Sequence, residues 1–138
     1  MSEEIWKDFP EVKGRVIESI DGLEVGSEAI FINFEDGDRI KMYHCQECCE
    51  SVQVEDCEDV SSDDLKESTI HTFEEYTKSS GESGWGLQTY TFYRLITNSS
   101  HCTIRWLGES NGYYGVSVRV VLEVKGGKDK VLSDGYGD

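Results

Sequence analysis

The sequence predicts an α+β fold that is mainly antiparallel β: a single compact domain with a twisted antiparallel sheet and one or two short helices. Several segments alternate apolar and polar residues with a period of two, and glycine-containing turn signals separate them. No amphipathic helical pattern is long enough to dominate. The 138 residues suffice for one hydrophobic core. We expect a globular domain over residues 1–124 and a flexible tail, rich in glycine and charge, over residues 125–138.

The N-terminal part of the chain predicts three strands. Asp21 and Gly22 form a turn signal after the first, and the Gly-containing stretch 35–38 joins the second and third as a hairpin. The alternation in the second strand directs its apolar side chains to one face. The expected strands are residues 12–20, 28–34 and 39–45, and the shared face carries Ile30, Ile32 and Phe34.

The middle of the chain has a weaker pattern. Residues 46–52 fit either a single helical turn or a bent strand end, and residues 52–57 fit a short strand. Residues 61–67 predict a short helix with a serine cap. The Gly/Ser-rich stretch 81–87 predicts a loop that carries an exposed Trp85.

The C-terminal half is more regular and predicts three further strands. In the first, alternation separates an aromatic face from a second apolar face. The last strand carries a stripe of valine and leucine. The expected strands are 87–97, with Tyr90, Phe92 and Ile96 on one face and Thr91, Tyr93 and Leu95 on the other, then 101–107, and 115–124, with the stripe Val116, Val118, Val120 and Leu122.

The pair Asn111-Gly112 is a strong signal for a two-residue hairpin turn. Regular pairing from that turn would place Arg105 among the valines, whereas one bulged residue at position 114 or 115 turns Trp106 inward. In the bulged register Trp106 pairs with Val118 and Ile104 pairs with Val120. Arg105 then lies opposite Arg119 on the solvent face, and two like charges there favour either an internal partner, Glu109, or a bound anion.

Charge limits the classes of partner. The chain has 28 acidic and 13 basic residues, a net charge of −15. Eleven carboxylates against Lys66 give residues 47–75 a net charge of −10. Such a surface repels nucleic acid and anionic membranes, so we expect no direct nucleic-acid binding and no membrane binding. The sequence also contains no apolar run of membrane-spanning length and no secretory signal, which predicts a cytoplasmic protein.

Three blocks of sequence, YHCQECCESV (43–52), TYTFYRLIT (89–97) and TIRWLGESNGYYGVSV (103–118), resemble an uncharacterised family of small bacteriophage and prophage proteins. Its motifs read HxQDCCE, TWTFY and IRWxGESNGYYS. The chain departs from them at Glu47, Tyr90 and Gly115. The resemblance implies a phage origin, action in an infected bacterial host, and one shared group of residues: His44, Gln46, Cys48, Cys49, Glu50, Arg105, Glu109, Ser110, Asn111 and Tyr113.

Metal binding and thiol catalysis are alternative readings of the cysteines. Five cysteines, an odd number, favour reduced thiols over a disulfide framework. A zinc site would use His44, Cys45, Cys48 and Cys49, but one CxxC without a second pair is weak evidence. Cys48 or Cys49 with His44 as base would meet the requirements of a cysteine enzyme, although nothing marks an oxyanion hole. We therefore expect no cofactor and lean against an enzyme.

Binding remains the favoured activity. We expect a non-enzymatic phage accessory protein, acting in host takeover or counter-defence, that binds a small anionic, nucleotide-like ligand at the hairpin 105–114. The alternative is an acidic inhibitor that mimics nucleic acid and binds a host protein. Homo-oligomerisation is also open. The candidate ligand residues are His44, Gln46, Glu50, Arg105, Glu109, Ser110, Asn111, Tyr113, Tyr114 and Arg119. The candidate inhibitor residues are Glu55, Asp56, Glu58, Asp59, Asp63 and Asp64.

Overall fold

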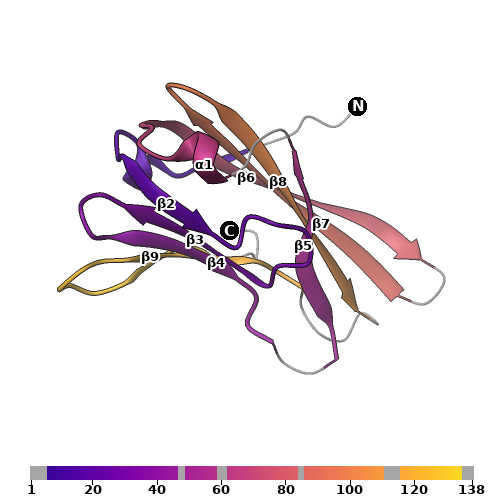
Figure 1. Cartoon of the computed structure of the whole chain (residues 1–138). Coiled ribbons are helices and arrows are strands. Elements are labelled where there is room, and N and C mark those ends of the chain that lie inside the picture. Colours follow the sequence, from indigo (N-terminus) through magenta and orange to yellow (C-terminus); the bar gives the residue numbers. More distant parts are fainter. Residues whose placement is uncertain (1–5, 47–48, 59–61, 84–85, 111–115, 135–138) are drawn as a thin grey trace.

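Two five-stranded antiparallel sheets pack against each other around one core (Figure 1). The computed structural model describes residues 6–46, 49–58, 62–83, 86–110 and 116–134. One sheet has the strand order β1-β6-β7-β8-β5, and the other has the order β10-β9-β4-β3-β2. The fold is therefore mainly antiparallel β as predicted, but the α+β class is wrong because the described chain contains almost no helix and has two sheets instead of one.

The second sheet confirms the predicted hairpin between β3 and β4, with Ile30, Ile32 and Phe34 buried on the inner face. β9 pairs with β4, although about 80 residues separate Met42 from its partner Val120. Strand β10 lies in the stretch expected to be a flexible tail. That expectation is wrong for residues 130–133, because they pair with β9. The strands are β2 Ile17–Asp21, β3 Ala29–Phe34, β4 Arg39–Tyr43, β9 Arg119–Glu123 and β10 Lys130–Ser133.

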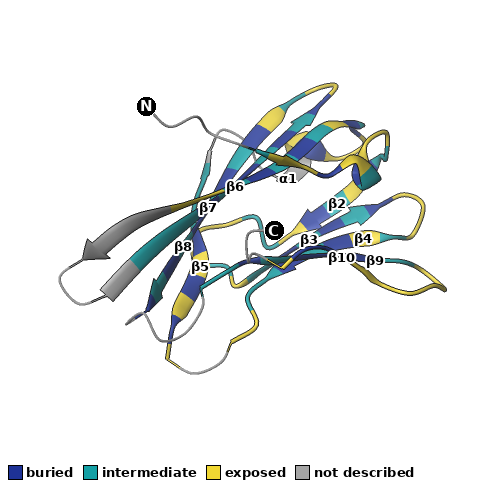
Figure 2. Cartoon of the chain, turned by 180° about the vertical axis from the view of Figure 1, so that it is seen from behind, coloured by how far each residue is buried: buried dark blue, intermediate teal, exposed yellow. Residues whose placement is uncertain are grey.

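The first sheet contains the longest strands of the protein. The alternation predicted for residues 87–97 is confirmed, since Thr91, Tyr93 and Leu95 are buried while the intervening residues are partly exposed (Figure 2). The expected loop at 81–87 is shorter than predicted, because Ser83 already pairs with Gly86. Trp85 lies outside the described residues. The strands are β1 Lys7–Asp8, β5 Ser51–Glu58, β6 Ile70–Ser83, β7 Gly86–Thr97 and β8 His101–Ser110.

Two short helical segments accompany the sheets: a 3-10 turn, Pro10–Val12, and the helix α1, Ser62–Leu65. The helix confirms the prediction for this part of the chain. Leu65 is fully buried, and the backbone after the helix exchanges hydrogen bonds with Ile17 of β2. These bonds close one end of the sandwich by tying the start of β2 to the segment that leads into β6.

The hairpin predicted from Asn111-Gly112 does not form. β8 pairs with β5 and β7, whereas β9 pairs with β4 and β10, so the two strands lie in different sheets. Trp106 is buried as expected, but its cross-strand neighbours are Val54 and Thr91 instead of Val118. The turn signal is misleading because asparagine and glycine favour connecting segments in general and do not specify that the flanking strands pair with each other. Residues 111–115 themselves lie outside the described residues.

The chain crosses between the sheets twice at the end of the sandwich opposite α1. The first crossover, residues 44–50, joins β4 to β5, and the second, residues 111–118, joins β8 to β9. Gly108 near the end of β8 permits a close approach of the second crossover. A Cβ at this position would lie 2.5 Å from the Cβ of Val116 and 2.9 Å from its carbonyl oxygen. These two crossovers position the candidate site.

Candidate functional site

His44 fastens the two crossovers together. Its Nδ1 lies 2.6 Å from the carbonyl oxygen of Ser117 in the second crossover, and its Nε2 lies 2.7 Å from the Glu50 carboxylate at the end of the first. The side chains of His44 and Glu50 are only 4% and 0% exposed. A carbonyl oxygen accepts hydrogen bonds only, so Nδ1 carries a proton and donates it to Ser117. We call these two residues the His44–Glu50 clip.

The clip shares a further proton between Nε2 and the carboxylate. This proton lies either on the ring, giving an imidazolium–carboxylate pair, or on Glu50, giving a neutral pair. In both cases the two ring nitrogens of His44 are occupied. The imidazole is thus unavailable in this arrangement as a ligand for a metal or as a base for a cysteine thiol.

Several other residues of the predicted ligand group gather around the clip. Gln46 donates a hydrogen bond of 2.6 Å to the backbone oxygen of Glu50. Glu109 lies directly opposite Ser51, and the neighbouring Ser110 is buried at the end of β8. The sequence blocks around residues 43–52 and 103–118 therefore meet at this end of the sandwich. Asn111, Tyr113 and Tyr114 lie outside the described residues.

A cavity of about 210 Å³ lies beside the clip. It is lined by His44, Cys45, Ser117, Arg119 and Asp134. We call it the Arg119 pocket. The register explains the grouping, because Arg119 begins β9 directly opposite Tyr43, the last residue of β4. Asp134 follows β10, whose Ser133 is paired with Val120. Asp134 was not among the predicted site residues, because it lies in the stretch expected to be a flexible tail.

Arg119 has unused hydrogen-bonding capacity. Its Nη1 donates to the sulfur of Cys45 at 3.5 Å, and its Nε is buried without an acceptor among the described residues. No ion pair joins it to a described carboxylate. The contact with the Cys45 sulfur raises the pKa of Arg119, so this group stays charged. Burial, followed by the proximity of Cys45, raises the pKa of Tyr43, which keeps its phenol protonated.

Arg105 does not belong to this site. It pairs across the sheet with Asp56 and Phe92, and its guanidinium lies 2.8 Å from Glu55 and 3.8 Å from Asp56. The prediction that Arg105 opposes Arg119 is therefore wrong, because it depended on the hairpin that does not form. The charge of Arg105 is balanced by the protein's own carboxylates.

The acidic segment 47–75 is less of a surface feature than its composition indicates. Glu50 and Glu75 are buried, and Glu74 forms an ion pair with Arg94. Glu55 and Asp56 share Arg105, as described above. Among the candidate inhibitor residues Asp64 is exposed, whereas Asp59 and the side chains of Glu58 and Asp63 lie outside what the structure describes.

The cysteines do not gather into a metal site within the described residues, where no group of three potential ligands occurs. Cys45, Cys57 and Cys102 are free thiols, and only Cys45 is exposed. Cys49 is disulfide-bonded, although the odd number of cysteines favoured reduced thiols over a disulfide framework. In this oxidation state Cys49 offers no thiolate to a metal or a substrate. Cys48 lies outside the described residues.

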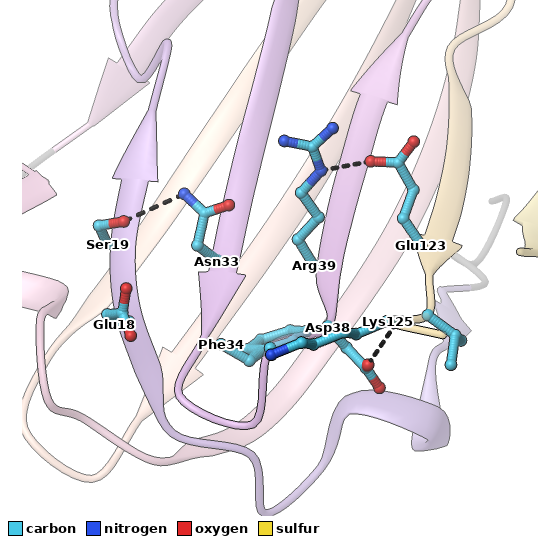
Figure 3. A pocket seen from close by; sticks show the side chains of 10 residues that line it. Glu18, Ser19, Asn33, Phe34, Asp38, Arg39, Glu123 and Lys125 are labelled. Carbon is cyan, nitrogen blue, oxygen red and sulfur yellow. Dashed lines mark hydrogen bonds and ion pairs between the residues drawn. The ribbon is translucent and has the colours of Figure 1, made fainter. Parts of the chain in front are cut away.

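A larger open cleft of about 550 Å³ lies on the outer face of the second sheet (Figure 3). Its polar groups mostly satisfy one another. Arg39 is paired with Glu123, and Asn33 donates to Ser19 at 3.0 Å. The Arg15 guanidinium, and after it the backbone N–H of Lys125, donate hydrogen bonds to Asp38 and lower the pKa of that carboxyl. Because Arg39 is already paired with Glu123 and the carboxylates Glu18, Asp38 and Glu123 also line the cleft, it is less suited to capture an anion than the smaller Arg119 pocket.

Sequence reasoning missed a second buried polar cluster, which joins the two sheets. Tyr93 donates a hydrogen bond of 2.6 Å to one oxygen of Glu75, and Ser133 of β10 donates to the other at 2.8 Å. Burial raises the pKa of Glu75, and the two hydrogen bonds act in the opposite direction. Alternation could have placed Glu75 inside, since it lies two residues after Phe73, but no strand was predicted there.

These features define a two-sheet antiparallel β domain whose crossovers are fastened by a buried histidine–glutamate pair beside a small cavity. The chain belongs to the DUF7448 family, a domain of unknown function, whose family model matches residues 10–120. The match includes both crossovers and the clip but ends before β10. No curated protein and no solved structure matches the chain. No helix in the described part of the chain is long and apolar enough to span a membrane.

Proposed function

We propose that this protein is a non-enzymatic phage accessory protein that binds a small anionic, nucleotide-like ligand in the Arg119 pocket. The observation that carries the binding site is the guanidinium of Arg119, which borders a cavity and has a buried Nε without a described acceptor. A phosphate or carboxylate accepts several charge-assisted hydrogen bonds from such a group. The phage origin rests on the resemblance of the three sequence blocks. The proposed binding site therefore lies at the crossovers and not at the hairpin predicted for residues 105–114.

The size of the cavity limits which part of the ligand enters it. At about 210 Å³ it is smaller than pockets that enclose whole drug-sized ligands. It suits one anionic group, with the rest of the ligand on the outer face of the sheet. There Tyr43 faces Arg119 across the strands, and the ammonium of Lys41 lies 4.3 Å from the Tyr43 ring centroid. Lys41 supplies a second positive charge for a ligand with more than one anionic group.

Asp134 lies in the same pocket and sets a limit on affinity. Its negative charge contributes to the raised pKa of Arg119 and competes with an incoming anion for the guanidinium. Removing this charge should therefore strengthen anion binding, whereas removing the Arg119 charge should abolish it. Opposite effects of the two substitutions would indicate a specific site. General electrostatic attraction is no alternative, because a protein with a net charge of −15 repels anions.

The test is a thermal-shift and calorimetric titration with inorganic phosphate and with nucleoside mono-, di- and triphosphates. A ligand at 100 times its Kd adds about 2.7 kcal/mol to the stability of the folded state, so the melting temperature should rise. Arg119→Gln should abolish the rise and Asp134→Asn should enlarge it. Arg39→Gln is the matched control, because Arg39 is paired on the same sheet face. No rise with any probe, or an equal rise in Arg119→Gln, would refute the proposal.

The runner-up is an acidic inhibitor that binds a basic host protein. It is favoured by the surplus of carboxylates, although the described members of the 47–75 segment are largely buried or paired. Charge reversal at Asp56, Asp59 and Asp63 should then destroy a salt-sensitive complex that Arg119→Gln leaves intact.

A further inference from the structure

The outer face of the first sheet carries a continuous row of aromatic rings. Tyr76 of β6 and Phe92 of β7 lie on neighbouring strands, with ring centroids 6.1 Å apart. Trp6, which immediately precedes β1, lies on the other side of Tyr76, with ring centroids 5.4 Å apart. Tyr90 continues the row along β7, 6.4 Å from Phe92. All four rings remain partly exposed. We call these four residues the aromatic row.

A guanidinium group lies over the ring at each end of this row. Arg94 lies 4.3 Å from the Trp6 ring centroid, and Arg105 lies 6.0 Å from the Tyr90 centroid. The rings of Tyr76 and Phe92 between them carry no cation among the described contacts. The face of an aromatic ring attracts cations, and a planar guanidinium stacks on it better than an ammonium group does. The rings of Tyr76 and Phe92 therefore offer further guanidinium groups the same kind of contact that Arg94 and Arg105 make at the ends of the row.

Carboxylates lie next to the rings at the β5 edge. Arg105 faces both Glu55, at 2.8 Å, and Asp56, at 3.8 Å, so two negative charges share one positive charge. Glu109 lies on the same face and accepts a hydrogen bond only from the neutral side chain of Gln88 among the described contacts. Lys78, directly opposite Tyr90, adds a second cation, so the three carboxylates exceed the two cations by one. This local surplus of negative charge has the same sign as the net charge of the chain, −15. Both favour a cationic partner and raise its rate of association.

We propose that the aromatic row binds an arginine-rich basic segment of another protein, whose guanidinium groups stack on Tyr76 and Phe92 and pair with Glu55, Asp56 and Glu109. Interfaces between proteins are enriched in tyrosine, tryptophan, phenylalanine and arginine, and the aromatic row with Arg94 and Arg105 provides all four residue types. The proposal is independent of the Arg119 pocket, which lies on the other sheet. It requires no conformational change of the sheet, because Tyr76, Tyr90 and Phe92 lie on regular strands.

The test compares an octa-arginine peptide with an octa-lysine peptide of the same charge, by fluorescence anisotropy at a single ionic strength of 0.15 M. Attraction to the acidic protein alone would bind both peptides equally. Stacking should make the arginine peptide bind roughly tenfold more tightly. The substitutions Tyr76→Ala and Phe92→Ala should each reduce that advantage and together should remove it, while the affinity for octa-lysine stays unchanged.

Two controls separate the row from the rest of the molecule. Phe31→Ala removes a ring from the outer face of the other sheet, where Arg39 and Lys41 already cover it, and should leave both affinities unchanged. Circular dichroism and the melting temperature of each variant establish that it is folded, and the milder Tyr76→Leu replaces any variant that unfolds. Equal affinity for the two peptides, or an arginine preference that survives loss of both rings, would overturn the proposal. So would self-association of the chain through this face, detected by sedimentation and abolished by Tyr76→Ala.

Discussion

The His44–Glu50 clip should contribute more to folding than any other polar pair at the crossovers. Its two side chains are 4% and 0% exposed, and His44 contacts both crossovers at 2.6 and 2.7 Å. His44→Ala removes the Nε2 contact of the buried Glu50 carboxyl group and the hydrogen bond that the Ser117 carbonyl accepts. Removing one member of a buried pair typically costs about 3–5 kcal/mol, which here corresponds to a fall in melting temperature of about 10 °C or more.

The size of the coupling is measured by a double-mutant cycle. We expect Glu50→Ala to cost about as much as His44→Ala, because it leaves Nε2 buried without its partner. The double variant should lose much less than the sum, with a coupling free energy of about 2 kcal/mol or more. Urea unfolding, followed by tryptophan fluorescence at fixed pH, gives each free energy. Additive effects, or a loss below about 1 kcal/mol for His44→Ala, would show that the crossovers are held by other contacts.

Three further predictions follow from buried or crowded positions. Gly108→Ala should lower the free energy of unfolding by about 1–3 kcal/mol, because the added Cβ would lie 2.5 Å from the Cβ of Val116. Urea titration measures this loss, and an unchanged stability would mean that the second crossover moves freely. Burial raises the folded-state pKa of Glu75, so the free energy of unfolding should fall as pH rises from about 4.5 through that raised pKa. Glu75→Gln should flatten this pH dependence in urea titrations at several pH values. A pH dependence that persists in the variant would show that Glu75 is not its source. In the native protein, a thiol reagent should modify the exposed Cys45 much faster than Cys102, which is buried, or Cys57, whose pKa is raised by burial. Peptide mass mapping measures the three rates, and equal rates would contradict the difference in burial.

The sequence predicted individual strands better than their pairing. Alternation identified β3, β4, β7 and β8 because each buries one face, which is a local property. Which strand pairs with which is not local, and Asn111-Gly112 resembled a hairpin turn although β8 and β9 lie in different sheets. The predicted β8–β9 hairpin placed Arg105 opposite Arg119, and the fold does not contain the binding site that depended on this pairing.

The site was predicted only in part, for the same reason. His44, Gln46 and Glu50 are close in sequence, so their proximity does not depend on how β8 and β9 are paired. Asp134 lies in the Arg119 pocket because it follows β10. The glycines and charged residues around β10 instead predict a flexible tail. The aromatic row depends on β6, where no strand had been predicted, so the neighbours of Phe92 could not be inferred.

The order of the strands has a consequence for how the protein is made. β4 needs β9 as its neighbour, but the four strands β5 to β8 of the other sheet lie between them in the chain. During synthesis the hairpin of β3 and β4 leaves the ribosome long before its partner exists, with the edge of β4 and one apolar face open. Because closing so long a loop delays the decisive contacts, folding should take milliseconds to seconds. The nascent chain is most exposed to aggregation in that interval.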